Sequence, residues 1–141
     1  DTAILDELGA KTYPAGTVIF PKVGGALLTN KKRVLAVEGT FDNNVMGLVP
    51  INIESIFLFY CMQNIDLREI ANTQALPSIR QSAVANLHIP LPPLSEQKRI
   101  AGILKEQLAA VEKARAAAQE QLDIINALPA SLLRKAFRGE I

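Results

Sequence analysis

The sequence has few of the side chains on which catalysis and metal binding depend. Its 141 residues include one cysteine, Cys61, and one histidine, His88. A single cysteine cannot form an intrachain disulfide, which favours a reducing cytoplasm. No two residues have the spacing of a metal site, Gly24-Gly25 is not a phosphate-binding loop, and the dinucleotide fingerprint is absent. We therefore expect no catalytic residue, no metal and no cofactor.

Long apolar runs are also missing. No stretch approaches the roughly 20 apolar residues of a membrane-spanning helix. The acidic start, Asp1 to Glu7, lacks the basic and apolar regions of a signal peptide. Hydrophobic residues make up 49% of the chain and charged residues 21%, which is typical of a globular protein. We expect a soluble protein, and the internal-looking start without Met suggests a fragment.

The chain has almost no excess of either charge. Its formal net charge is +1, whereas a strong nucleic-acid binder normally has a clear basic excess on one face. The charges are unevenly placed, however. Lys22 and residues 31–33 lie close together in the first third, while acidic residues collect at the start and along the C-terminal part. A local basic surface therefore stays open as a prediction.

The first ninety residues predict a small α+β domain with short strands. Residues 53–63 are apolar on every side, which indicates a buried helix, and residues 72–82 form a polar loop. His88 and Cys61 lie in apolar segments, where such residues are more often packed in the core than used as ligands. Short β-rich segments lie at 17–20, 26–29, 34–37, 45–49 and 87–89. The second and third of these predict a hairpin whose tip is the basic segment 30–33.

A proline-rich strap then leads into a long helix. Pro90, Pro92 and Pro93 disfavour helix, because each fixes φ and restricts the residue before it. Ser95 fits an N-cap, and Glu96 places a negative charge in the first turn, where the helix dipole favours it. Nothing interrupts the helix until about residue 128, so the chain predicts an arm roughly 50 Å long at 1.5 Å per residue.

The arm has the apolar repeat of a coiled coil. An amphipathic helix packed on its own domain is the alternative, but such an arm is longer than a ninety-residue domain is wide, so part of it must find another helix. The a/d positions, with one charged interruption, are Leu104, Leu108, Val111, Arg115, Ala118, Leu122 and Ile125.

The end of the arm contains a proline. Pro129 predicts a kink or break near residue 128, followed by a short helix over residues 130–137 that Gly139 ends. An apolar face on that segment is formed by Leu132, Leu133 and Phe137. Ordinary core packing explains such a face as well as a docking surface does.

The strap Pro92-Pro93-Leu94-Ser95-Glu96-Gln97 and the ending Leu132-Leu133-Arg134-Lys135-Ala136-Phe137-Arg138-Gly139-Glu140 together resemble the C-terminal half of the specificity subunit of type I restriction-modification systems. The resemblance runs from about residue 15 to residue 141. It implies a partial DNA target-recognition domain at residues 1–94 and a spacer helix at residues 95–141, with a kink near Pro129. It also implies that two such arms pack antiparallel, here from two copies of the chain.

The resemblance implies a function without catalysis. Such a chain directs methyltransferase and restriction subunits to a site on double-stranded DNA, and the Leu132, Leu133 and Phe137 face lies near the helices that help dock the methyltransferase. The alternative is a scaffold that dimerises or docks subunits without reading DNA. DNA contacts need side chains that bind phosphates or base edges, and the candidates in exposed-looking loops are Lys22, Asn30, Lys31, Lys32, Arg33, Asn43, Asn44, Gln74, Ser78, Arg80 and Gln81.

Overall fold

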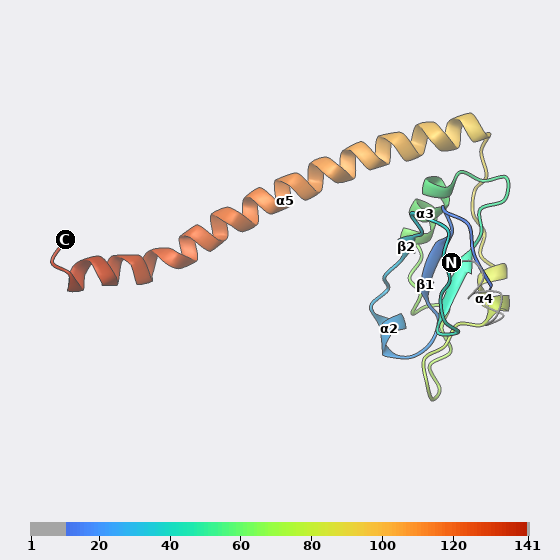
Figure 1. Cartoon of the computed structure of the whole chain (residues 1–141), viewed down its shortest axis with the longest axis horizontal. Coiled ribbons are helices and arrows are strands. Elements are labelled where there is room, and N and C mark those ends of the chain that lie inside the picture. Colours follow the sequence, from blue (N-terminus) through green and yellow to red (C-terminus); the bar gives the residue numbers. More distant parts are fainter. Residues whose placement is uncertain (1–10, 141) are drawn as a thin grey trace. The chain divides into compact units, whose positions relative to one another are not determined.

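The chain folds into two compact units, Asp1–Ala101 and Gly102–Ile141. The computed structural model describes residues 11–140, so the acidic start, Asp1 to Glu7, lies outside the described residues. Figure 1 shows a small sheet with short helices in the first unit, and one long helix that begins in the first unit and makes up most of the second. The predicted α+β domain with short strands and a long C-terminal helix is confirmed. Within residues 11–140, no helix combines the length and the apolar character needed to cross a membrane.

The first unit is built around a three-stranded antiparallel sheet. Strand β1 (Val18–Pro21) lies between β2 (Arg33–Val34) and β3 (Val45–Leu48). Val18 and Phe20 are buried while Ile19 is only half-buried, so β1 turns alternate side chains toward the core. Phe20 lies opposite Met46 of β3. Strand β3 forms an edge of the sheet, because it pairs only with β1.

Helix α3 (Ser55–Gln63) completes the core of this unit, and it confirms the helix expected at 53–63. It begins at Glu54, whose carboxylate accepts a hydrogen bond from the Phe57 N–H. Such a cap satisfies a backbone donor that has no partner within the helix. The buried cluster draws on the sheet, on α3, on the short helix α2 (Gly25–Leu28) and on two loops. Its members are Val18, Phe20, Leu27, Leu58, Met62, Leu67 and Ile79.

Four short segments differ from the expectation. Of the predicted strand 34–37 only Val34 lies in a strand, the two-residue β2. The predicted strand 26–29 is instead the short helix α2 (Gly25–Leu28), so β2 pairs with β1 and the expected hairpin is absent. A second short helix, α4 (Gln81–Ala85), begins inside the predicted loop. Residues 87–89 form no strand: Leu87 and Ile89 pack against the core as irregular chain, and His88 is exposed rather than packed. These segments are too short for their apolar pattern to separate helix from strand.

The long helix α5 (Leu94–Phe137) starts slightly before the predicted position. The Pro93 carbonyl accepts the N–H groups of Glu96 and Gln97, so Pro93 rather than Ser95 occupies the cap position. Gln97 is 2% exposed and both ends of its side-chain amide are used. Its Nε2 donates to the Pro92 carbonyl at 2.8 Å, and its Oε1 accepts from the Glu54 N–H at 2.8 Å. One side chain thus ties the strap and the start of α3 to the first turn of α5.

Pro129 does not end α5. The helix continues through it to Phe137, so the expected break and separate short helix are absent. Proline costs the helix one hydrogen bond, to the carbonyl of Ile125, while the turns on either side keep theirs. As predicted, Gly139 ends the helix: its φ is 71°, and its N–H donates to the Ala136 carbonyl at 3.0 Å. This positive φ suits a glycine.

Replacing the buried amide at the start of α5 should destabilise the first unit. The change Gln97→Ala leaves the Glu54 N–H and the Pro92 carbonyl without these partners, and we expect a loss of about 1–3 kcal/mol in the free energy of unfolding. Urea denaturation measures this loss. The matched control is Gln107→Ala, because Gln107 is an exposed glutamine on the same helix. Equal unfolding midpoints for the two variants would contradict the assigned role of Gln97.

Candidate nucleic-acid interface

Several of the predicted DNA-contacting residues meet around Lys22. The Lys22 N–H donates to the Asn44 carbonyl at 2.8 Å, and the Lys22 carbonyl accepts the Ile79 N–H at 2.8 Å. The turn at 42–44 and the segment 77–81 therefore flank the end of β1. This backbone pairing gathers five of the candidates on one part of the surface, namely Lys22, Asn44, Ser78, Arg80 and Gln81.

Two more candidates adjoin this group. Asn43 is exposed next to Asn44, and the Asp42 carboxylate accepts hydrogen bonds from the backbone and side-chain N–H groups of Asn44, which fixes the turn. Gln74 is exposed at the tip of a second turn, which paired backbone hydrogen bonds between Asn72 and Ser78 close.

A pocket of about 810 Å³ opens over β3 beside this group. Its apolar floor includes Met46, Leu48 and Val84. Lys11, Lys22, Arg80 and Gln81 also line it, and none of the described lining residues is acidic. We call it the β3 pocket. A smaller hollow of about 180 Å³ shares Arg80 with it. Three cations around a concave surface favour an anionic ligand.

Two aromatic rings form one wall of the β3 pocket. The rings of Tyr13 and Phe41 are stacked with centroids 4.2 Å apart, and the Lys11 Nζ lies 5.4 Å from the Tyr13 centroid. Phe41 in turn packs on Gly47 of β3, where an added Cβ would come within 2.5 Å of its ring. The stack holds Lys11 at the pocket through a cation–π contact. Sequence reasoning missed Lys11, Tyr13 and Phe41, because their neighbours in the fold lie far away in the sequence.

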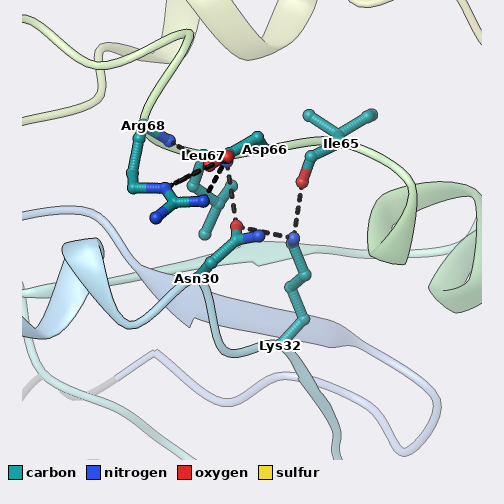
Figure 2. A network of polar contacts seen from close by, with 6 residues as sticks. All are labelled: Asn30, Lys32, Ile65, Asp66, Leu67 and Arg68. Carbon is teal, nitrogen blue, oxygen red and sulfur yellow. Dashed lines mark hydrogen bonds and ion pairs between the residues drawn. The ribbon is translucent and has the colours of Figure 1, made fainter.

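A second group of candidates lies along β2, the opposite edge of the sheet. Lys31 and Arg33 are exposed there, but Lys32 between them is only 3% exposed. Its Nζ donates to the Asn30 Oδ1 at 2.8 Å and to the Ile65 carbonyl at 2.6 Å (Figure 2). Burial lowers the pKa of this ammonium. The expectation that Lys32 is an exposed contact is therefore wrong, because its charge is used inside the protein.

Asn30 is also occupied by internal contacts. Its Oδ1 accepts the Leu67 N–H at 2.9 Å, and its φ of 55° is a left-handed conformation that asparagine tolerates. Close by, the exposed Arg68 forms an ion pair with the half-buried Asp66 (Figure 2). The hydrogen bonds from Arg68 lower the Asp66 pKa to about 2, so this carboxylate stays ionised near neutral pH and is poorly suited to accept a proton.

Lys32 and Lys31 should therefore behave differently when replaced. The change Lys32→Ala leaves the Ile65 carbonyl and the Asn30 Oδ1 without their buried donor, and we expect it to lower the free energy of unfolding by about 1–3 kcal/mol. Lys31→Ala removes the same charge from an exposed position and should stay within about 0.5 kcal/mol of the unchanged chain. Chemical denaturation of both variants checks this pair. Two equally stable variants would show that the buried ammonium carries no structural role.

The described residues do not bring Cys61 or the acidic side chains together into a metal site. Cys61 is half-buried in α3, and burial raises the pKa of its thiol, which makes the reactive thiolate less accessible. Within residues 11–140, no three His, Cys, Asp or Glu side chains lie close enough to hold a metal ion.

Beyond Ala101, the apolar positions of α5 are largely uncovered. The exposed fraction of the side chain is 47% for Leu108 and 59% for Ile125, and the fractions for Val111 and Leu122 lie between these two values. Leu104 is half-buried, whereas Arg115 and Ala118 are exposed. The proposed docking residues Leu132, Leu133 and Phe137 are also exposed, Phe137 at 89%. A long helix with an uncovered apolar stripe is typical of a helix that pairs with another one.

The chain thus combines a small domain that has a basic pocket with a long helix whose apolar stripe is largely uncovered. The family model for the type I restriction modification DNA specificity domain matches residues 3–121, and the chain belongs to this family.

The chain is also similar to a specificity subunit and to a solved structure. It is 32% identical over 136 residues to the type I restriction enzyme EcoDI specificity subunit of Escherichia coli, a match that covers 92% of this chain and 29% of that protein. A chain solved in work on complex assembly and conformational transition of the type I R-M system matches with a TM-score of 0.72 and 26% identity, covering 93% of this chain and 33% of that one. The chain thus spans about a third of the length of these relatives.

Proposed function

We propose that the first unit recognises double-stranded DNA and that the β3 pocket is its contact surface. The observation that carries this proposal is the meeting of Lys11, Lys22 and Arg80 around one concave surface with no acidic residue among its described lining. The net charge of +1 does not oppose it, because the local balance at the surface governs phosphate binding. Family membership supports the same function.

Within the pocket, the side chains suit two different tasks. Lysine ammonium groups bind phosphate oxygens and hold the protein on the duplex without reading sequence. Arginine and glutamine can bond in pairs to guanine and adenine edges in the major groove. We therefore assign Lys11 and Lys22 to the phosphates, and Arg80 and Gln81, with Gln74 and Asn43 on the adjoining turns, to base contacts.

The assignment of the phosphate contacts is tested by comparing two double variants, one of which loses two cations at the β3 pocket and the other two cations at the β2 edge of the sheet. Double replacement of Lys11 and Lys22 by Ala should weaken binding to all duplexes alike. The plot of log affinity against log salt should become less steep, by about 0.9 for each phosphate that the protein no longer neutralises. The matched control, with Lys31 and Arg33 replaced by Ala, removes the same charge from the β2 edge and should leave the slope nearly unchanged. Fluorescence anisotropy with a pool of randomised duplexes measures both.

A further variant separates sequence reading from phosphate binding. Gln81→Ala carries no charge change, so it should keep the salt slope but alter which duplexes are selected from the pool. Equal slopes for the two double variants would place the phosphate contacts away from the β3 pocket. No measurable binding at any salt concentration would instead favour the alternative, a scaffold that docks subunits without reading DNA.

The chemistry of restriction and modification is assigned to other subunits. We propose that this chain is not an enzyme and that it brings methyltransferase and restriction subunits to the DNA in a reducing cytoplasm. The exposed apolar face of Leu132, Leu133 and Phe137 supports a docking role for the end of α5. In this division of labour, residues 1–94 recognise DNA and residues 95–141 form the spacer arm.

The arm is assigned to helix pairing. In isolation, the partner available to it is a second copy of the same chain, so we propose an antiparallel homodimer through the a/d stripe. Burying a Leu, Val or Ile side chain contributes about 1.5–3 kcal/mol, and each copy offers Leu108, Val111, Leu122 and Ile125. This gain offsets the entropy cost of associating two chains only if most of the stripe is covered.

Placing charges in the stripe tests the pairing. The double variant Leu108→Asp with Leu122→Asp should be monomeric by sedimentation at concentrations where the unchanged chain dimerises, because carboxylates resist burial in an apolar interface. As a control, aspartates at Lys105 and Lys113, outside the stripe, should leave the dimer intact. An unchanged chain that stays monomeric at high micromolar concentration would remove the homodimer proposal.

A further inference from the structure

The a/d stripe of α5 has one charged member, and its position is informative. Arg115 lies near the middle of the stripe, with Leu108 and Val111 on one side and Leu122 and Ile125 on the other. Its guanidinium meets the Glu112 carboxylate of the same helix at 3.8 Å. Both side chains are exposed, at 79% and 71%, so this contact is a weak one that leaves Arg115 available to a partner.

In an antiparallel pair, an a residue of one helix faces a d residue of the other, and few registers of two copies are compatible with the stripe. In one register Leu108 faces Ile125 and Val111 faces Leu122, so these four large apolar residues meet one another. Leu104 then faces Pro129. Arg115 then faces the small Ala118. Shifting the register by one heptad places Arg115 opposite either Val111 or Ile125. The first register, centred between Ala116 and Ala117, is therefore the best available to two copies.

This register has an electrostatic cost. The centre of symmetry lies between Ala116 and Ala117, so the two Arg115 side chains occupy neighbouring layers on either side of it. No a or d position of the described helix supplies a carboxylate to them, because all its acidic residues lie outside the stripe, namely Glu96, Glu106, Glu112, Glu120 and Asp123. Two like charges at the centre of an apolar interface repel each other and give up part of their hydration.

We infer that Arg115 selects the partner of the arm: the preferred occupant of the stripe is an α-helix with a matching apolar repeat and a carboxylate in the layer next to Arg115, and a second identical copy is the weaker partner. This inference rests on the proposed pairing of the arm. Charged core positions of coiled coils select partners in this way, since an unlike pair is favoured where both like pairs are not.

The experiment supplies the carboxylate on a second copy of the full chain. Unchanged chain is mixed with Arg115→Glu, and native mass spectrometry resolves the two homodimers and the heterodimer by mass. Random association gives one part of each homodimer to two parts heterodimer. At low salt we expect about ten parts or more of heterodimer to one part of each homodimer, and we expect this ratio to fall toward two to one as salt screens the charges.

Two controls separate the possible failures. Lys113→Glu reverses a charge of the same sign on the outward face, so its mixture with the unchanged chain should remain statistical at every salt concentration. Arg115→Leu removes the charge and should dimerise at least tenfold more tightly than the unchanged chain.

A statistical mixture with Arg115→Glu, while Arg115→Leu still dimerises, overturns the role of Arg115 and leaves the pairing intact. If no variant dimerises, Arg115→Leu included, the inference and the proposed pairing both fail.

Discussion

The side-chain amide of Gln97 is the contact on which the organisation of the chain depends. Three segments meet at it: the strap through the Pro92 carbonyl, the start of α3 through the Glu54 N–H, and the first turn of α5, to which Gln97 itself belongs. Each of these segments ends with backbone groups that have no partner in regular structure. One buried side chain satisfies a donor and an acceptor at once, so a proline-rich strap can lead into a helix without leaving polar groups unpaired in the core.

The β3 pocket shows how backbone pairing builds a surface from distant parts of a sequence. Lys22, which directly follows β1, bonds through its backbone to Asn44 and Ile79, and these bonds leave its side chain free for another task. The stack of Phe41 and Tyr13 on Gly47 places Lys11 at the same surface. The basic character of the pocket is thus a product of topology, which explains why a chain with a net charge of +1 has such a surface.

The parts of the structure that were predictable are those with a long or strongly periodic pattern. The helix α5 and the buried helix α3 follow from apolar spacing over many residues, and β1 and β3 from β-rich runs between turns. The strand predictions for 26–29 and 87–89 were wrong, because so few residues fit the apolar period of a helix as well as that of a strand. The packing of Leu27 and Leu87 against the core decides which structure forms.

The two lysines at the basic tip show why the site was only partly predictable. Lys31 and Lys32 are identical in type and adjacent in the sequence, yet one is exposed and the other is 3% exposed. Local sequence does not separate them, since Lys32 bonds not only to the nearby Asn30 but also to the Ile65 carbonyl, which is 33 residues away. The same limit applies to Tyr13 and Phe41, whose stacking requires the fold to bring residues 13 and 41 together.

The arm presents the opposite case, because in the proposed pairing its apolar repeat serves contacts outside the chain and can be read from the sequence without knowledge of the fold. Within the described helix the stripe beyond Ala101 is largely uncovered, so its residues were not chosen to fill a core of their own. A leucine at position 115 would pair more tightly with almost any apolar helix, including an identical one. In the proposed pairing, an arginine there weakens every such contact except one with a suitably placed carboxylate, so the arm gives up affinity and gains selectivity for its partner.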